Sequence, residues 1–331
     1  MNNYIIQSVS CIVPAYNSAM TIHACINGLL GQTFQNIEII IVDDGSKDGT
    51  GKLCDEYAEK YKNVKVIHQD NGGVSRARNT ALKYATGDRI IFVDADDEIQ
   101  ATYVENLIAE EADWVLGGYM NGAHIIAIQS QHYIDREIPQ LFSTHFHRLY
   151  STVPWGKLYK RSIIQNNNLK FDPNIRLGED LIFNLNYLLH CDSVVTISST
   201  GYNYIQEEFG ADRYNLKIEE IEYTLNQVSK GMELLSQKYE NTKFTSEAIK
   251  RTLIGAYPLD YILNGRYDEY EALYFSTFFE KDRKVFWNDA ICSPFMRGTR
   301  KIKYLIKKHQ YAIALHLMLQ LLYAYCKYSM R

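Results

Sequence analysis

Short apolar runs alternate with amphipathic helical patterns over the first third of the chain. The apolar runs predict strands at residues 9–13, 37–42, 64–68 and 89–93, and the segments between them predict helices at 21–30, 51–61 and 75–85. Strands this apolar, separated by helices, are typical of a parallel sheet that is buried on both faces. The pattern therefore predicts an α/β fold for this part of the chain.

The pattern changes twice further along. It predicts a helix at 102–111, a strand at 114–119, an irregular strand pair and a helix within 120–150, and helices at 155–167 and 179–190. Beyond residue 215 it is almost entirely helical, with predicted helices at 216–239, 245–263, 268–280 and 300–328. We therefore expect an α/β domain over residues 1–210 and a helical C-terminal region over 211–331.

Composition narrows the class of protein. The 331 residues are 46% hydrophobic and 22% charged, which is ordinary for a soluble globular protein. The six cysteines are scattered without metal-type spacing, which favours a reducing compartment, and the N-terminus does not resemble a signal peptide. A net charge of −4 argues against a nucleic-acid partner.

Three of the predicted strands are followed by residues suited to a charged ligand. They are, in chain order, Pro14, Tyr16 and Asn17; Asp43, Asp44, Gly45 and Ser46; and Asp94, Asp96 and Asp97. A single acidic strand end is an ordinary turn. Ligands of open parallel sheets, however, bind at the carboxyl ends of the strands, so three such ends together predict a binding site.

The acidic group after the fourth strand suits a metal ion. Asp94 and Asp96 point the same way from an extended segment, because side chains alternate with a period of two. Hard carboxylate oxygens favour Mn²⁺ or Mg²⁺, which take further ligands from substrate phosphates. The alternative, that these acids cap the helix predicted from residue 102, fits Asp97 or Glu98 better than Asp94.

The other two groups suit a nucleotide. Asp44 can accept a hydrogen bond from a base, and Gly45 lets the chain turn close to a ligand. Gly72 and Gly73 precede a predicted helix whose N-terminus can bind phosphate, and Arg76 and Arg78 follow them. Either arginine fits the diphosphate. Neither a GxxxxGK[ST] loop nor a GxGxxG turn is present in the sequence, which argues against ATP hydrolysis and dinucleotide chemistry.

Residues 10–17, 42–46, 73–79 and 94–97 resemble the signature motifs of glycosyltransferase family 2, in the same order. The resemblance covers residues 8–205. It implies a GT-A fold, which is a Rossmann-like, mixed but mainly parallel sheet with helices on both faces. It also implies a nucleotide-diphosphate sugar donor, inversion at the anomeric carbon, a donor half over 8–100 and an acceptor half over 101–210.

The resemblance also implies a role for individual residues of the donor half. Pro14, Tyr16 and Asp44 would hold the nucleoside, and Asn17 and Ser46 belong to the same two loops. Asp94 would lie near the ribose and the metal, and Asp96 would be the direct metal ligand. Arg76 or Arg78 would approach the diphosphate.

Residues 155–161 and 177–180 resemble acceptor-side motifs of the bacterial surface-polysaccharide branch of the family. This implies that Trp155 and Lys157 lie on the acceptor side and that Asp180 is the general base, with Glu179 orienting it or binding the acceptor. A helix N-terminus stabilises such a carboxylate, which must take a proton from the attacking hydroxyl.

One segment departs from the pattern of that branch. After Tyr202 and Tyr204, the chain has Ile205 and Gln206 where a basic residue is expected. The expectation of a loop that closes over the phosphates is therefore weakened.

The last 35 residues, 297–331, contain eight Lys or Arg and no Asp or Glu. Their uncharged stretch 311–326 is short for a transmembrane helix. Such a basic amphipathic tail fits an anionic membrane surface, or it packs on the body or in a homodimer interface. The lipid-linked acceptors of similar enzymes favour the membrane, so we expect a cytoplasmic protein on the inner face of the cell membrane.

The leading hypothesis is an inverting, metal-dependent transferase that moves a sugar, from UDP by default, to a lipid-linked bacterial surface glycan. A sugar nucleotidyltransferase of similar fold would carry a Gly-rich, basic loop directly after the first strand, which residues 14–20 lack. A non-catalytic glycan-binding or scaffold protein is disfavoured because Asp44, Asp94, Asp96 and Asp180 are all present.

Overall fold

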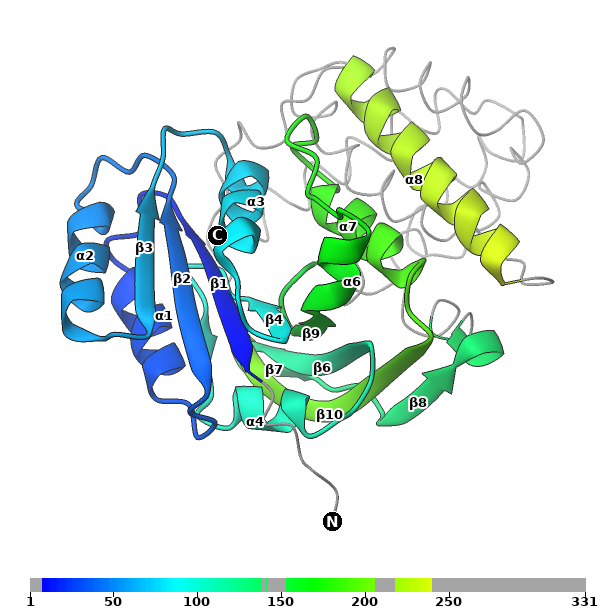
Figure 1. The fold of residues 1–331 in the computed structure, drawn as a ribbon, viewed down its shortest axis with the longest axis horizontal. Coiled ribbons are helices and arrows are strands. Elements are labelled where there is room, and N and C mark those ends of the chain that lie inside the picture. The colour runs from blue at the N-terminus through cyan, green and yellow to red at the C-terminus, as the bar shows by residue number, and fades with distance from the viewer. Residues whose placement is uncertain (1–7, 139–140, 142–152, 206–217, 240–331) are drawn as a thin grey trace, which may run out of the picture. The chain divides into compact units, whose positions relative to one another are not determined.

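A computed structural model describes residues 8–138, 141, 153–205 and 218–239. These residues form a mixed sheet, with strand order β3-β2-β1-β4-β9-β6-β10-β5, while β7 pairs with β6 and β8 with β10 (Figure 1). The predicted fold class, a mainly parallel α/β sheet with helices on both faces, is confirmed.

The donor half forms one end of this sheet. Its strands are β1 (Val9–Ala15), β2 (Ile37–Asp43), β3 (Val64–His68) and β4 (Arg89–Phe92), and its helices are α1 (Ile22–Leu30), α2 (Thr50–Lys60) and α3 (Val74–Tyr84). All pairings among these four strands are parallel. The sequence therefore predicts this end of the sheet strand by strand.

The order of these strands explains where a ligand fits. The chain moves outward from β1 to β3 and then crosses back to β4, on the other side of β1. Because such crossovers are right-handed, α1 and α2 lie on one face of the sheet and α3 on the other, as Figure 1 shows. The reversal beside β1 is the topological switch point, where open α/β sheets bind ligands.

The acceptor half completes the sheet. Its strands are β5 (Glu98–Ile99), β6 (Trp114–Asn121), β7 (His124–Ile126), β8 (Gln131–Ile134), β9 (Lys157–Lys160) and β10 (Ser193–Tyr204). Its helices are α4 (Tyr103–Ile108), η1 (Asp135–Glu137), α6 (Arg161–Asn166) and α7 (Glu179–Leu188). β9 lies antiparallel between β4 and β6, and β10 runs parallel to β6.

One prediction in this half is wrong, and one strand was missed. The helix predicted over 155–167 is instead the central strand β9 followed by the short helix α6. Trp155, Leu158 and Tyr159 have helical spacing, but all three are buried because β9 is covered on both faces. The long strand β10 was not predicted, because its second half is rich in Ser, Thr, Gly and Asn.

Aromatic side chains fill the core between β4, β9 and α7. Phe171 stacks on Phe183 with their ring centroids 4.0 Å apart, and Phe92 meets both rings edge-on. Tyr159 and Tyr187 pack at 4.9 Å in the same cluster. This core fixes α7, and with it the predicted base, against the carboxyl end of β4.

The helix α8 (Ile218–Lys238) confirms the helix predicted over 216–239. Near its end, Lys238 Nζ donates a hydrogen bond of 2.6 Å to the carbonyl of Cys191. Among the described residues, no helix is both long and apolar enough to cross a membrane. The domain boundary near 210 stays a prediction, and the helices predicted over 245–263, 268–280 and 300–328 and the basic tail 297–331 lie outside the described residues.

Candidate active site

The loops that follow β1 and β2 are bound to each other. Asn17 N–H donates to Ser46 Oγ at 2.9 Å, and its Oδ1 accepts the N–H of Lys47 at 2.8 Å. Asn17 has a φ of 49°, a left-handed conformation that asparagine tolerates. Pro14 is buried within β1, whereas Tyr16 is 50% exposed. Asn17 and Ser46 therefore hold the two loops together, Pro14 is part of the strand, and the ring of Tyr16 is accessible to a base.

Asp44 is almost fully buried and fixes the glycine loop. It accepts hydrogen bonds from the N–H of Gly72 at 3.0 Å, the N–H of Gly73 at 2.7 Å and the amide of Gln69 at 2.6 Å. Gly73 has a φ of 85°, which is unfavourable for other residues. A carboxylate has about four acceptor positions, so three donors leave little room for a base. The predicted contact of Asp44 with a base therefore stays a prediction.

Asp43 and His68 form a further charged contact at the same sheet edge. His68 Nδ1 lies 2.9 Å from Asp43 Oδ2, and its Nε2 lies 2.9 Å from Asp55 Oδ1. Hydrogen bonds with Asp43 and Asp55 raise the pKa of His68 above its ordinary value. Burial would raise the pKa of Asp43, but hydrogen bonds from Ser46 and His68 lower it below its usual range. Sequence reasoning missed His68, although Asp43 and His68 end neighbouring strands in register.

Arg78 joins the two halves of the site. Its Nη2 lies 2.9 Å from Asp94 Oδ1 and its Nη1 lies 2.7 Å from Asp180 Oδ1, while Glu179 Oε1 lies 4.0 Å away. Burial alone would lower the pKa of Arg78, but Asp180, Asp94 and Glu179 raise it above its ordinary value. The guanidinium is 4% exposed and stays charged. Arg78 therefore binds carboxylates of this chain, and Arg76 is left as the candidate for the diphosphate.

Arg76 is exposed at the start of α3. Its side chain folds back over Gly72, where an added Cβ would lie 2.5 Å from Arg76 Cδ. Only a glycine at position 72 leaves room for this conformation. The guanidinium of Arg76 thus lies beside the glycine loop, where the N–H groups of Gly72 and Gly73 donate to Asp44 and leave the N–H groups at the start of α3 as the phosphate candidates.

The carboxylates of Asp94, Asp96 and Asp97 have oxygen atoms within 4.8 Å of one another. Asp94 and Asp96 are half-buried, but Asp97 is 1% exposed. The predicted cap role of Asp97 is wrong: it accepts hydrogen bonds from the Tyr202 hydroxyl at 2.5 Å and from the N–H of Ile205 at 2.8 Å. Asp97 therefore anchors the acidic loop to β10 and the residue after it, whereas Asp94 and Asp96 are accessible to solvent.

These residues fit a divalent cation. Near Arg78 and the acidic loop, Asp94, Asp96, Glu179 and Asp180 together carry more negative charge than Arg78 alone balances. Burial, and then the charge of Asp94, raises the pKa of Asp97 to about 8. Such crowding of hard oxygen donors favours Mg²⁺ or Mn²⁺.

The two predicted acceptor-side residues are buried. Trp155 is 3% exposed and stacks on Tyr202, with ring centroids 4.6 Å apart and an interplanar angle of 4°. Lys157 is 1% exposed, and its Nζ donates to the carbonyls of Val153 at 2.6 Å and Trp155 at 3.1 Å. Burial lowers the pKa of Lys157 to about 7, although Asp180 opposes this shift. Their described contacts are with the protein, and their predicted place beside an acceptor stays a prediction.

Tyr202 connects this aromatic stack to the acidic loop. Its hydroxyl accepts the N–H of Asp94 at 3.2 Å and donates to Asp97, while its ring lies on Trp155. Sequence reasoning noticed Tyr202 as part of a departure from the family pattern but gave it no role. Its contacts reach across more than a hundred residues, which local patterns cannot reveal.

The sheet, with an acidic loop at its switch point, has the GT-A fold of glycosyltransferases, which its solved structural neighbours share. A solved structure of Staphylococcus aureus TarS residues 1–349 with UDP-GlcNAc has a TM-score of 0.57 and 21% identity, and covers 81% of this chain and 86% of that one. The mannosyltransferase PcManGT of Pyrobaculum calidifontis, solved with GDP-Man and Mn²⁺, has a TM-score of 0.53 and 15% identity, and covers 95% and 87%.

The chain belongs to glycosyltransferase family 2. The model described as Glycosyl transferase family 2 matches residues 10–123. Glycosyltransferase GlyG of Streptococcus pneumoniae serotype 4 is 32% identical over 213 residues, which cover 59% of this chain and 70% of GlyG. TarS, named a poly(ribitol-phosphate) β-N-acetylglucosaminyltransferase, is 29% identical over 208 residues, which cover 61% of this chain and 36% of TarS.

The predicted family is thereby confirmed. The match extends beyond the family model, since the alignments with GlyG and TarS each cover more than half of the chain. The chain nevertheless spans only 30% to 60% of the length of three further curated relatives.

Proposed function

We propose that this protein transfers a sugar from a nucleotide-diphosphate donor to a hydroxyl group of a bacterial surface glycan, with inversion at the anomeric carbon. The observation that carries the proposal is the pair of ion pairs of Arg78. Because one guanidinium binds both Asp94 and Asp180, the donor-side and acceptor-side carboxylates lie within the span of a single side chain. A reacting sugar carbon between a metal-bound diphosphate and a base requires this proximity.

On the donor side, Asp94 and Asp96 would hold the divalent cation, and Tyr16 would contact the nucleoside. A bound cation would neutralise the negative charge that develops on the departing diphosphate. Arg76 and the N–H groups at the start of α3 would bind the same diphosphate. These roles rest on the exposure of Tyr16, Arg76, Asp94 and Asp96 around one sheet edge.

On the acceptor side, the carboxylate of Asp180 would take the proton of the attacking hydroxyl. The new bond forms between that oxygen and C1 of the sugar, the bond from C1 to the diphosphate oxygen breaks, and the nucleoside diphosphate leaves with the bonding electrons. Attack from the face opposite the leaving group inverts C1. Glu179, buried beside Asp180 and Arg78, would hold the base in position.

The choice of substrates rests on the comparisons. TarS was solved with UDP-GlcNAc and PcManGT with GDP-Man and Mn²⁺, which supports a UDP-sugar first, a GDP-sugar second, and Mn²⁺ as the test cation. The poly(ribitol-phosphate) polymer for which TarS is named supports a surface-polymer acceptor. A lipid-linked acceptor, a place on the inner face of the cell membrane through residues 297–331, and a homodimer remain parts of the proposal.

The test is sugar-nucleotide turnover by the purified chain with Mn²⁺ across UDP-, GDP- and dTDP-sugars. We expect release of the nucleoside diphosphate from at least one donor, and a loss of about 100-fold or more in Asp96→Asn, because a metal site supplies several kcal/mol. Glu98→Gln is the matched control, since Glu98 is an exposed acid two residues further on. No turnover and no metal-dependent nucleotide binding with any donor would contradict the proposal.

A further inference from the structure

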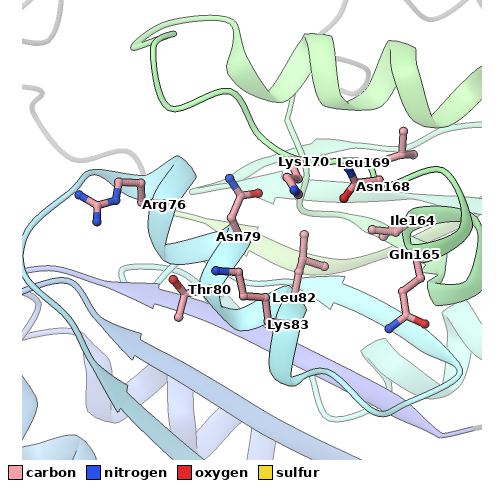
Figure 2. A pocket seen from close by; sticks show the side chains of 10 residues that line it. All are labelled: Arg76, Asn79, Thr80, Leu82, Lys83, Ile164, Gln165, Asn168, Leu169 and Lys170. Carbon is pink, nitrogen blue, oxygen red and sulfur yellow. The ribbon is translucent and has the colours of Figure 1, made fainter.

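A pocket of about 540 Å³ lies between α3 and the segment that runs from α6 to residue 170. Figure 2 shows its lining from both walls. Three cations, three amides, one hydroxyl and three aliphatic side chains contribute to it, and the polar ones are Arg76, Lys83, Lys170, Asn79, Gln165, Asn168 and Thr80. Its size is within the range of ligand pockets.

All the charged residues that line this pocket, called the basic pocket below, are positively charged. The residues that line it include no Asp or Glu. Within the described ranges, Arg76, Lys83 and Lys170 make no ion pair, although the chain as a whole has a net charge of −4. Cations gathered in one concave site repel one another, and a bound anion relieves that repulsion.

The walls of the pocket are fixed by a pair of hydrogen bonds. Asn79 Nδ2 donates to the carbonyl of Phe171 at 2.7 Å, and Asn79 Oδ1 accepts the N–H of Phe171 at 2.9 Å. These bonds join α3 to the chain immediately after Lys170. The two backbone segments that carry the basic side chains are therefore joined without a ligand, which lowers the cost of binding.

The pocket lies next to the candidate active site. Phe171 follows the pocket residue Lys170, and its ring centroid is 5.3 Å from the guanidinium carbon of Arg78. Arg78 in turn binds Asp180. The pocket is thus connected to the proposed base through Phe171 and Arg78, as the binding site of an extended acceptor would be.

We propose that the basic pocket binds a phosphate group of the acceptor, as a phosphodiester or a diphosphate. Lys83 and Lys170 would bind the phosphate oxygens, the amides would orient them, and the aliphatic side chains would pack against the carbon skeleton. The proposal deepens the proposed function, on which it rests, by naming a phosphate-bearing acceptor as the substrate class.

The test compares two double variants. Lys83→Ser with Lys170→Ser removes two pocket charges, and neither residue has a proposed role in transfer. Lys52→Ser with Lys62→Ser removes two exposed charges elsewhere. Calorimetry measures binding of inorganic pyrophosphate without metal and with saturating UDP in the donor site. We expect affinity to fall about tenfold or more in the pocket variant and to stay unchanged in the control.

A second arm uses vesicles of phosphatidylcholine with phosphatidylglycerol. Loss of pyrophosphate binding with vesicle binding retained assigns the phosphate to the glycan. Loss of vesicle binding, with or without loss of pyrophosphate binding, assigns it to a lipid headgroup, and each of these results supports the pocket. Equal binding of both probes by the two variants, or pyrophosphate binding that UDP abolishes, would overturn it. Donor hydrolysis by the same variants tests the proposed function separately, and we expect it to be unchanged in both.

Discussion

The donor and acceptor halves use their conspicuous side chains differently. In the donor half, Tyr16, Asp94 and Asp96 follow parallel strands and remain accessible at the sheet edge. In the acceptor half, Trp155 and Lys157 lie at the start of a central antiparallel strand and are buried. A polar or aromatic motif at the end of a parallel strand thus indicates a ligand-binding residue. A similar motif at the start of the antiparallel strand β9 is buried and contacts other residues of the protein instead.

Within the candidate site, Arg78 and Tyr202 each contact both halves. Arg78 binds Asp94 of the donor half and Asp180 of the acceptor half. Tyr202, from the acceptor half, holds the backbone of Asp94 and the side chain of Asp97. The comparison predicts that changes at these two contacts affect both halves, whereas changes at the exposed donor residues affect ligand binding alone.

The largest expected effect is that of Arg78→Met. It leaves Asp94, Glu179 and Asp180 without their shared cation, and removing one partner of a buried pair costs about 3–5 kcal/mol. We expect the free energy of unfolding to fall by that amount in urea denaturation. Arg76→Met is the control, because Arg76 is exposed; it should change stability by less than about 0.5 kcal/mol and weaken donor binding instead. Equal stability of the two variants would show that Arg78 does not join the halves.

A smaller effect is expected for Tyr202→Phe. The hydroxyl orients the acidic loop, and loss of such an outer contact typically weakens metal binding about 10- to 100-fold. Tyr187→Phe is a matched control, because Tyr187 is equally buried. Its hydroxyl accepts a hydrogen bond from the N–H of Lys160 and donates one to the carbonyl of Asp113. Calorimetric titration with Mn²⁺ should separate the two variants. The same Mn²⁺ affinity in both variants would contradict the claim that the Tyr202 hydroxyl, on β10, orients the metal-binding loop.

The smallest effect concerns His68, whose pKa is raised by Asp43 and Asp55. A raised pKa in the folded state stabilises the protein at pH values below the unfolded value of about 6.5, and this contribution is lost as the pH rises through the folded value. His68→Gln should therefore lower the melting temperature more at pH 5.5 than at pH 8.5. The cost should stay below about 1 kcal/mol, because the His68 side chain is 49% exposed.

His23 supplies the control for this pH dependence. It is exposed and contacts the Tyr57 hydroxyl rather than a carboxylate. His23→Gln should show no such difference between the two pH values. The same pH dependence in both variants would contradict the assigned ion pairs of His68.

The sequence predicts the donor half well for a physical reason. Parallel strands joined by helices leave a strong local pattern, and their carboxyl ends must share one edge of the sheet, so Asp94 and Asp96 could be assigned to one site. The local sequence pattern does not reveal the hydrogen bonds that build the site, because these join residues that are far apart in the sequence. The hydrogen bonds of Asp44 to Gly72, of Arg78 to Asp180 and of Tyr202 to Asp97 span 28, 102 and 105 residues.

The errors in the acceptor half have equally local causes. A strand buried on both faces, such as β9, has no polar–apolar alternation to distinguish it from a helix. The polar second half of β10 resembles a loop until its pairing with β6 is known. Both elements are defined by neighbours that are distant in sequence.

The most direct test of the central claim is a paired measurement on Asp180→Asn. Asparagine keeps an oxygen that can accept the hydrogen bond of Arg78 but cannot take a proton from the acceptor. The account predicts that the affinity for the sugar nucleotide with Mn²⁺ changes by less than about twofold, while sugar transfer falls about 100-fold or more. Transfer at the normal rate, with donor binding intact, would contradict it.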